Sequence, residues 1–307
     1  MSLCAKTKRW LKANGDISLA GKTVLVTGAN SGVGFKTSEV AVYLGARVIL
    51  ACRNTVKAAA ARDSLLKDYP DADIRIMRLD MASLKSVAAF VKELKETGTD
   101  IHAFVNNAGT FAPPGGKTAD GFDPVMGTNY IGVYYLTELA LPYLAGLSHK
   151  VVYINTVSVA VMAAKPIDYS DFYCLKKPGH FTVYARSKLC LAKYTFALAK
   201  RMNGSGVQVF MSHPGITITP LTLNACGKWG KRLSAVAGKL FNSTEKSSLA
   251  LAYILARHPL EGSQVGPHLL FNCYGYPRIN RLPKKAQTGA EELIDFTEKE
   301  IERIHIE

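Results

Sequence analysis

The 307-residue sequence contains no long apolar segment, because charge or glycine interrupts every apolar run well before about 18 residues. No transmembrane helix is therefore expected, and the N-terminus has no apolar core that would indicate a secretory signal. The six cysteines are scattered and form no C-x-x-C pair. Neither a disulfide framework nor a zinc site is predicted, no bound metal is expected, and a reducing, cytoplasmic location fits best.

Acidic residues are also scarce, since 24 Asp and Glu face 38 Lys and Arg and the formal net charge is +14. Such a charge suits nucleic acid, a membrane surface or an anionic ligand. No nucleic-acid-binding module is recognisable, so nucleic acid is not expected as a partner. A phosphate-rich cofactor remains, as does weak peripheral membrane contact through the basic N-terminus, where Trp10 and Leu11 flank the charges. A basic solvated surface without specific meaning is the alternative.

No internal repeat and no flexible linker divides the chain. Strand-like runs alternate with helical segments, and they lie at residues 22–27, 47–51, 74–79, 103–105, 151–154, 207–211 and 269–271. This alternation predicts a single-domain α/β fold, a doubly wound (Rossmann-type) parallel sheet with helices on both faces and ligands at the carboxyl ends of the strands. The catalytic domain is expected over 21–287, after an N-terminal extension at 1–20 and before a C-terminal helix at 288–307. A long irregular segment at 216–243 is predicted to be a substrate loop.

A glycine-rich turn, T-G-A-N-S-G-V-G, follows the first predicted strand and precedes a helical pattern. This order is the context of a dinucleotide-phosphate site, where glycine lets the backbone approach the pyrophosphate and the helix N-terminus offers unpaired N–H groups. An ordinary glycine-rich turn is the alternative. The residues expected to hold the cofactor here are Gly28, Asn30, Ser31, Gly32, Val33 and Gly34.

The second predicted strand lacks an acid at its end. An acid there would bind the ribose 2′-hydroxyl and favour NAD. Instead Cys52 is followed by Arg53 and Asn54. A guanidinium suits a 2′-phosphate, so NADP(H) is the predicted cofactor, with Arg53 as a plain surface arginine as the alternative.

Tyr184 and Lys188 stand four residues apart, so on a helix they share one face. An ammonium beside a phenol favours the phenolate, and the pKa of Tyr184 is therefore expected to fall. Such a tyrosine exchanges a proton with a carbonyl or alcohol oxygen. On its own the pair is a weak signal, because a core tyrosine beside a solvated lysine has the same spacing.

Four motifs occur together in one order. The glycine-rich turn is followed by N-N-A-G at 106–109, by Thr156 and Ser158 after a strand, and by Y-x-x-x-K at 184–188. With these motifs the chain resembles the short-chain dehydrogenase/reductase superfamily over roughly residues 20–280. The gap of 28 residues from Thr156 to Tyr184, with strings such as A-C-R-N and H-P-G, is similar to the retinol-dehydrogenase-like branch and to protochlorophyllide reductases.

The resemblance implies further roles. Asn129 matches an asparagine that kinks a helix and orders a water beside the lysine. The usual Ser-Ser is replaced by T-V-S, so Thr156 is favoured as the hydroxyl at the substrate oxygen, with Ser158 as the alternative. Asp80 would lie near the adenine ring, or else cap the helix that begins near Ser83. The other implied cofactor contacts are Met81, Asn107, Ala108, Gly109, Pro214, Gly215 and Ile216, beside Tyr184 and Lys188 themselves.

These observations predict an NADP(H)-dependent enzyme that transfers a hydride between nicotinamide and a carbonyl or alcohol of a bulky apolar substrate, of retinoid, steroid or lipid type. Its pocket is expected to be lined by aromatic and apolar residues of the two long irregular segments, namely Phe172, Tyr173, Phe181, Trp229, Leu240 and Phe241. Reduction of a conjugated C=C bond and a non-catalytic NADP(H)-binding regulator are the alternatives. A monomer or a homodimer is expected.

Overall fold

The computed structural model describes residues 3–15, 17–111, 113, 115–173, 179–215, 217, 243–266 and 276–306. Within these ranges eight strands form one sheet in the order β3-β2-β1-β4-β5-β6-β7-β8. The strands are β1 Thr23–Thr27, β2 Arg47–Cys52, β3 Ile74–Arg78, β4 Ala103–Asn106, β5 Val151–Thr156, β6 Val207–Ser212, β7 Gln264–Gly266 and β8 Arg278–Asn280. Neighbouring strands run parallel except β7 and β8. The predicted doubly wound α/β fold is confirmed.

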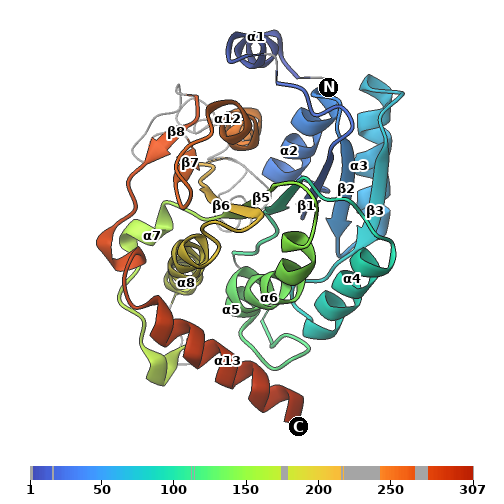
Figure 1. Ribbon diagram of the computed structural model, residues 1–307. Coiled ribbons are helices and arrows are strands. Elements are labelled where there is room, and N and C mark those ends of the chain that lie inside the picture. The colour runs from blue at the N-terminus through green and yellow to red at the C-terminus, as the bar shows by residue number, and fades with distance from the viewer. Residues whose placement is uncertain are drawn as a thin grey trace.

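Helices cover both faces of this sheet (Figure 1). On one face α2 (Gly32–Tyr43), α3 (Thr55–Asp68) and α12 (Ala250–Arg257) bury one apolar cluster. On the other, α4 (Leu84–Glu96), α6 (Gly132–Ala145) and α8 (His180–Arg201) bury a larger one. The shorter elements are α5 Pro124–Met126, the π-turn η1 Gly127–Ile131, α7 Ala160–Ala163, the 3₁₀ turns η2 Tyr169–Asp171 and η4 Lys284–Ala286, and α11 Thr244–Ser247.

The central strands are apolar on both faces because both faces are covered. β1 (T-V-L-V-T) and β5 (V-V-Y-I-N-T) are buried along their whole length, as expected for parallel strands between two helical layers. The strand order reverses between β1 and β4, since β1 leads outward to β2 and β3 whereas β4 leads to β5 and β6. Ligands of such sheets bind at this switch point, outside the carboxyl ends of the strands.

The last two strands differ from the sequence-based prediction. The expected strand at 269–271 lies outside the described residues, as do Trp229, Leu240, Phe241 and nearly all of the predicted substrate loop. Instead β7 pairs with β6 a few residues earlier, and β8 adds an antiparallel edge strand. Each has only three residues with a single apolar side chain, Val265 or Ile279, which is too short a pattern to predict a strand.

Helix α1 (Ala5–Ala13) packs on the domain through its apolar side chains. Leu11 is buried with Val40 of α2 and Leu249, and the ring of Trp10 stacks on Tyr276 with centroids 5.1 Å apart. Trp10 and Leu11 therefore hold the helix in place rather than facing outward, contrary to the role expected for them at a membrane. No helix in the described ranges has both the length and the apolarity to cross a bilayer.

The C-terminal helix α13 (Ala290–Ile306) packs against α8 (Figure 1). The Tyr130 hydroxyl lies 2.8 Å from the Thr297 hydroxyl, and the Tyr134 hydroxyl donates to Glu298 at 2.9 Å. Phe172 is only 2% exposed and its ring lies 4.7 Å from that of Phe296.

Tyr173 belongs to the same contact, because its hydroxyl donates to Glu300 of α13 at 2.5 Å. The prediction that Phe172 and Tyr173 line the substrate pocket is therefore wrong. The apolar face of α13, which the sequence does not assign to a partner, covers them.

Candidate active site at the carboxyl ends of β1, β4 and β5

The glycine-rich turn after β1 closes directly against the end of β4. Gly28 and Gly32 adopt φ of +65° and +59°, the left-handed region that favours glycine. A Cβ on Gly28 would lie 2.9 Å from Cα of Ala108, and one on Gly34 would lie 2.3 Å from Nδ2 of Asn107. Because α2 begins at Gly32, the turn delivers the N-terminus of that helix to this edge of the sheet. The backbone thus forms the cradle that a pyrophosphate requires.

Two side chains hold this cradle in shape, and the sequence reasoning gave a role to neither. The Thr27 hydroxyl accepts the backbone N–H groups of Asn107 and Ala108 at 3.0 and 2.9 Å, while the Asn107 amide donates to the Thr27 carbonyl at 3.0 Å. The buried Cys52 thiol accepts the backbone N–H groups of Ala29 and Asn30; burial raises the pKa of Cys52 and these bonds partly offset the rise. A buried polar residue at the last position of a strand could have indicated Thr27.

The candidate cofactor-binding residues that follow β2 and β3 differ in exposure and in the hydrogen bonds they already make. Arg53 is exposed and forms no ion pair with any described carboxylate. Asn54 caps α3 by accepting the N–H of Lys57 at 2.9 Å. Asp80 is partly exposed and accepts the N–H of Ala82, whereas α4 is capped by Ser83.

Met81 is buried. A Cβ on Gly132 would lie only 2.1 Å from the Met81 carbonyl oxygen, so this glycine allows the two backbones to approach closely. Met81 therefore packs against the start of α6. Ser31 is exposed beside the turn, with Asn30 and Val33 partly exposed.

Lys188 is buried between α8 and β5, with 4% of its surface exposed. Its ammonium donates to the backbone carbonyl of Thr156 at 2.8 Å and lies 6.0 Å from the centre of the Tyr184 ring. The same Nζ would lie 3.7 Å from a Cβ on Gly109. Burial lowers the pKa of Lys188 to about 8, because few groups replace the water that a charged amine loses.

Tyr184 faces the same space but does not have the lowered pKa that its spacing from Lys188 predicted. Its ring packs on Phe111 with centroids 4.9 Å apart. Burial raises the pKa of Tyr184, and a hydrogen bond between its hydroxyl and Ser158 offsets only part of the rise. The prediction of a lowered pKa is wrong for this structure, since the Lys188 ammonium is directed to the Thr156 carbonyl.

Ser158, rather than Thr156, reaches the Tyr184 hydroxyl. The side chain of Thr156 lies in the last position of β5 and is 9% exposed, and the main-chain oxygen of this residue binds Lys188. Because β5 ends at Thr156, the two-residue alternation used to place the hydroxyls does not extend to Ser158. The chain turns there, and the partly exposed Ser158 is brought over the tyrosine.

Asn129 is fully buried in the π-turn η1, the form of helix irregularity that its match to a kinking asparagine implies. Its Oδ1 accepts the N–H of Thr110 at 2.7 Å, and its Nδ2 donates to the Thr110 carbonyl at 2.8 Å and to the Ser187 hydroxyl at 3.1 Å. It therefore holds the neighbours of Gly109 and Lys188 and acts as a positioning residue.

The segment after β6 completes this edge of the sheet. His213 is buried, and burial lowers its pKa to about 4. The carbonyl of Pro214 accepts hydrogen bonds from the hydroxyls of Thr217 and Ser247 at 2.8 and 2.6 Å. Gly215 adopts φ of +74° and donates its N–H to Nδ1 of His213 at 3.3 Å. Ile216 lies outside the described residues.

The order of these elements matches a known family over most of the chain. A family model described as short chain dehydrogenase matches residues 22–226. The chain belongs to this family. Short chain dehydrogenases are oxidoreductases that bind a nicotinamide cofactor. In this chain the glycine turn after β1 and the Tyr184 cluster lie at the same edge of the sheet.

Similar proteins place this short chain dehydrogenase in the retinol-dehydrogenase-like branch. It is 33% identical to retinol dehydrogenase 12 of Homo sapiens, covering 80% of this chain and 78% of that protein. It is 34% identical to retinol dehydrogenase 14 of Mus musculus, covering 81% and 73%. The predicted resemblance to the superfamily and to this branch is confirmed.

Solved structures share the fold. An uncharacterized protein from Mycobacterium Paratuberculosis is 26% identical, with a TM-score of 0.73 over 93% of this chain and 95% of that one. The Pseudomonas aeruginosa RhlG/NADP active-site complex is also 26% identical, with a TM-score of 0.60 over 78% and 91%.

The close contact of the glycine turn with Asn107 gives a direct test of the cradle. Gly34→Ala should destabilise the fold by about 1–3 kcal/mol and weaken dinucleotide binding, because the added Cβ meets the Asn107 amide and the Gly28 carbonyl. Gly179→Ala is the matched control, since φ there is −61° and a Cβ meets no atom within 4 Å. Urea unfolding and cofactor titration measure both effects, and equal behaviour of the two variants would contradict this account of the turn.

Proposed function

We propose that this short chain dehydrogenase uses NADP(H) to transfer a hydride to or from a carbonyl or alcohol of a bulky apolar substrate. The observation that carries the proposal is the cluster of Tyr184, Ser158 and Lys188 at the end of β5. β4 alone separates β5 from β1, whose glycine turn forms the cradle. The reacting groups and the dinucleotide site therefore share one edge of the sheet.

The chain's own residues supply proton transfer and positioning. The Ser158 hydroxyl is close enough to Tyr184 to act on its pKa, so both hydroxyls are placed to donate to one substrate oxygen. The raised pKa of Tyr184 keeps it protonated at neutral pH, which suits donation to a carbonyl oxygen during reduction. Lys188 donates one N–H to the Thr156 carbonyl, and its two other N–H groups can bond to a ribose hydroxyl. The bound nicotinamide carries the hydride.

The preference for NADP(H) is inferred from the end of β2. Cys52 occupies the position where an acid would bind the 2′-hydroxyl of NAD, and its thiol is occupied by the glycine turn. The exposed Arg53 offers a guanidinium for a 2′-phosphate. The similar RhlG structure, whose description includes NADP, supports the same choice.

An apolar substrate is favoured by the groups around the tyrosine and by the similar proteins. Phe111 packs on Tyr184, and Phe181, one helical turn before it, is 53% exposed. The names of the similar retinol dehydrogenases denote a long apolar alcohol. The outward Lys6, Arg9 and Lys12 of α1 would give weak electrostatic attraction to an anionic membrane from which such a substrate could be drawn.

Turnover with a substrate panel tests the function. The protein should consume NADPH with apolar aldehydes or ketones, and Tyr184→Phe should lose about 10²-fold or more of the rate while keeping cofactor affinity, because only the proton donor is removed. Product analysis separates the alternatives. Reduction of enones that leaves the carbonyl intact would indicate a C=C reductase. NADPH binding without any turnover would indicate a non-catalytic regulator, and either result overturns the proposal.

The two hydroxyls can be told apart by substitution. Ser158→Ala should lower kcat by about 10²–10³-fold, because a donor to the developing negative charge is lost. Thr156→Val should lower it less than about tenfold, because the carbonyl that binds Lys188 is retained. Steady-state kinetics with one aldehyde measures both, and the reverse order would restore Thr156 as the substrate-oxygen donor.

Cofactor choice depends on one guanidinium. Arg53→Ala should raise the Kd for NADPH by about 10–100-fold, the effect of about 1.5–3 kcal/mol from bonds to a charged group, and change that for NADH less than about threefold. Arg62→Ala, at a partly exposed arginine on α3 paired with Asp63, is the matched control and should change neither. Equal losses for both cofactors in the Arg53 variant would refute the assignment.

A further inference from the structure

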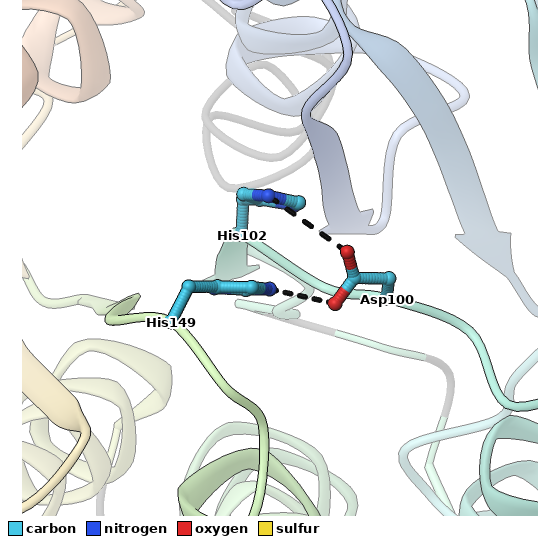
Figure 2. A group of neighbouring side chains, drawn as sticks. All are labelled: Asp100, His102 and His149. Carbon is cyan, nitrogen blue, oxygen red and sulfur yellow. Dashed lines mark hydrogen bonds and ion pairs between the residues drawn. The ribbon is translucent and has the colours of Figure 1, made fainter.

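A second cluster of chemically active side chains lies at the opposite edge of the sheet. Asp100 and His102 stand just before β4, and His149 stands just before β5 (Figure 2). β4 and β5 are parallel neighbours with Ala103 opposite Val152, so the segments that enter them meet at the amino edge. The six residues of β5 separate this cluster from the catalytic edge by roughly 20 Å.

The three side chains converge through atoms that bind metals. The imidazole rings of His102 and His149 are stacked, with centroids 3.9 Å apart and planes inclined by 9°. Each Nε2 faces one oxygen of Asp100, at 2.6 Å for His149 and 3.9 Å for His102 (Figure 2). The three candidate ligand atoms all lie within 4.8 Å of one another.

Both ring nitrogens of His149 face hydrogen-bond acceptors. Its Nδ1 lies 3.2 Å from the backbone carbonyl of Lys150, and its Nε2 lies 2.6 Å from the Asp100 carboxylate. Both partners are hydrogen-bond acceptors, whereas a neutral imidazole has only one N–H. When Nδ1–H is directed to the carbonyl, Nε2 is free to bind a proton or a metal ion that faces Asp100. An Nδ1–H bond to a backbone carbonyl is also how proteins orient a ligating histidine.

We propose that Asp100, His102 and His149 form a binding site for a divalent transition metal of the Zn²⁺ class. Two imidazoles and one carboxylate suit Zn²⁺, Co²⁺ or Ni²⁺, with water completing the coordination. Mg²⁺ and Ca²⁺ prefer oxygen ligands and should not compete. At this edge the metal takes no part in hydride transfer. It joins the segment before β4 to the segment before β5 and stabilises the folded chain.

Small movements are enough to form the site. Bonds of about 2.0–2.2 Å place tetrahedral ligand atoms about 3.3 Å apart. The 2.6 Å contact between His149 and Asp100 must therefore open by under about 1 Å, and the more distant His102 nitrogen, at 3.9 Å, must approach. The Asp100 side chain is 57% exposed and can move. His102 gives up a weak bond at 3.3 Å, in which its Nδ1 accepts the N–H of Thr23. Lys22, whose charge acts on both rings, opposes the metal.

Cobalt titration of the full chain tests the proposal, because tetrahedral or five-coordinate Co²⁺ absorbs visible light far more strongly than aqueous Co²⁺. The parent protein should develop these bands, and Zn²⁺ but not Mg²⁺ should raise its Tm. His149→Ala and Asp100→Asn should weaken Co²⁺ binding by about tenfold or more. Lys22→Gln should strengthen it by a few-fold, since one opposing charge is removed.

The matched control is His258→Asn, which removes an exposed histidine elsewhere and suits its left-handed φ of 41°. It should bind Co²⁺ like the parent. If the cobalt spectrum stays that of the aqueous ion, or if the His149 and His258 variants bind equally, the cluster holds only a proton and the proposal is overturned. NADPH turnover plays no part in this test, so its outcome is separate from that of the proposed function.

Discussion

The arrangement of the active site depends on a lysine buried between a helix and a strand. The hydrogen bond from the Lys188 ammonium to the Thr156 carbonyl joins α8 to the end of β5, the point at which the chain turns to present Ser158. The fall of the Lys188 pKa from 10.5 to about 8 corresponds to about 3 kcal/mol of disfavoured charge. The packing of the 22-residue α8 offsets this cost. A charged amine is thus held beside Tyr184 at the expense of stability.

A series of contacts supports that lysine from the far side of the domain. Thr297 of α13 bonds to Tyr130, and Tyr130 neighbours Asn129 in the π-turn. Asn129 in turn holds Thr110 and Ser187, the neighbours of Gly109 and Lys188. Both N–H groups and the oxygen of the Asn129 amide bond in this way, so its geometry is fixed by the fold. The C-terminal helix therefore has a structural connection to the catalytic edge although it contributes no group to it.

The sequence predicts the parts of this protein that are governed by local pattern, and it misses those decided by packing. The buried central strands and the glycine turn have periodic or motif signals and lie where they were expected. The role of Ser158 depends on where β5 ends, and the pKa of Tyr184 depends on burial and on the direction of the Lys188 amine. Spacing alone determines neither. Phe172 has the composition of a pocket residue, but α13 covers it.

The two edges of the sheet are joined by β4 and β5, whose register is fixed by buried polar side chains. Between the histidine cluster and the catalytic edge, the Asn106 amide donates to Asn155 at 2.9 Å and to Tyr153 at 2.6 Å, and Asn155 donates to Thr195 at 2.9 Å. This buried network already fixes β4 against β5 and α8. The metal proposed at the amino edge would therefore add stability to a register that is set without it. It leaves unmoved the carboxyl ends, where the glycine cradle and the tyrosine must keep their geometry, because packed interiors resist gradual deformation.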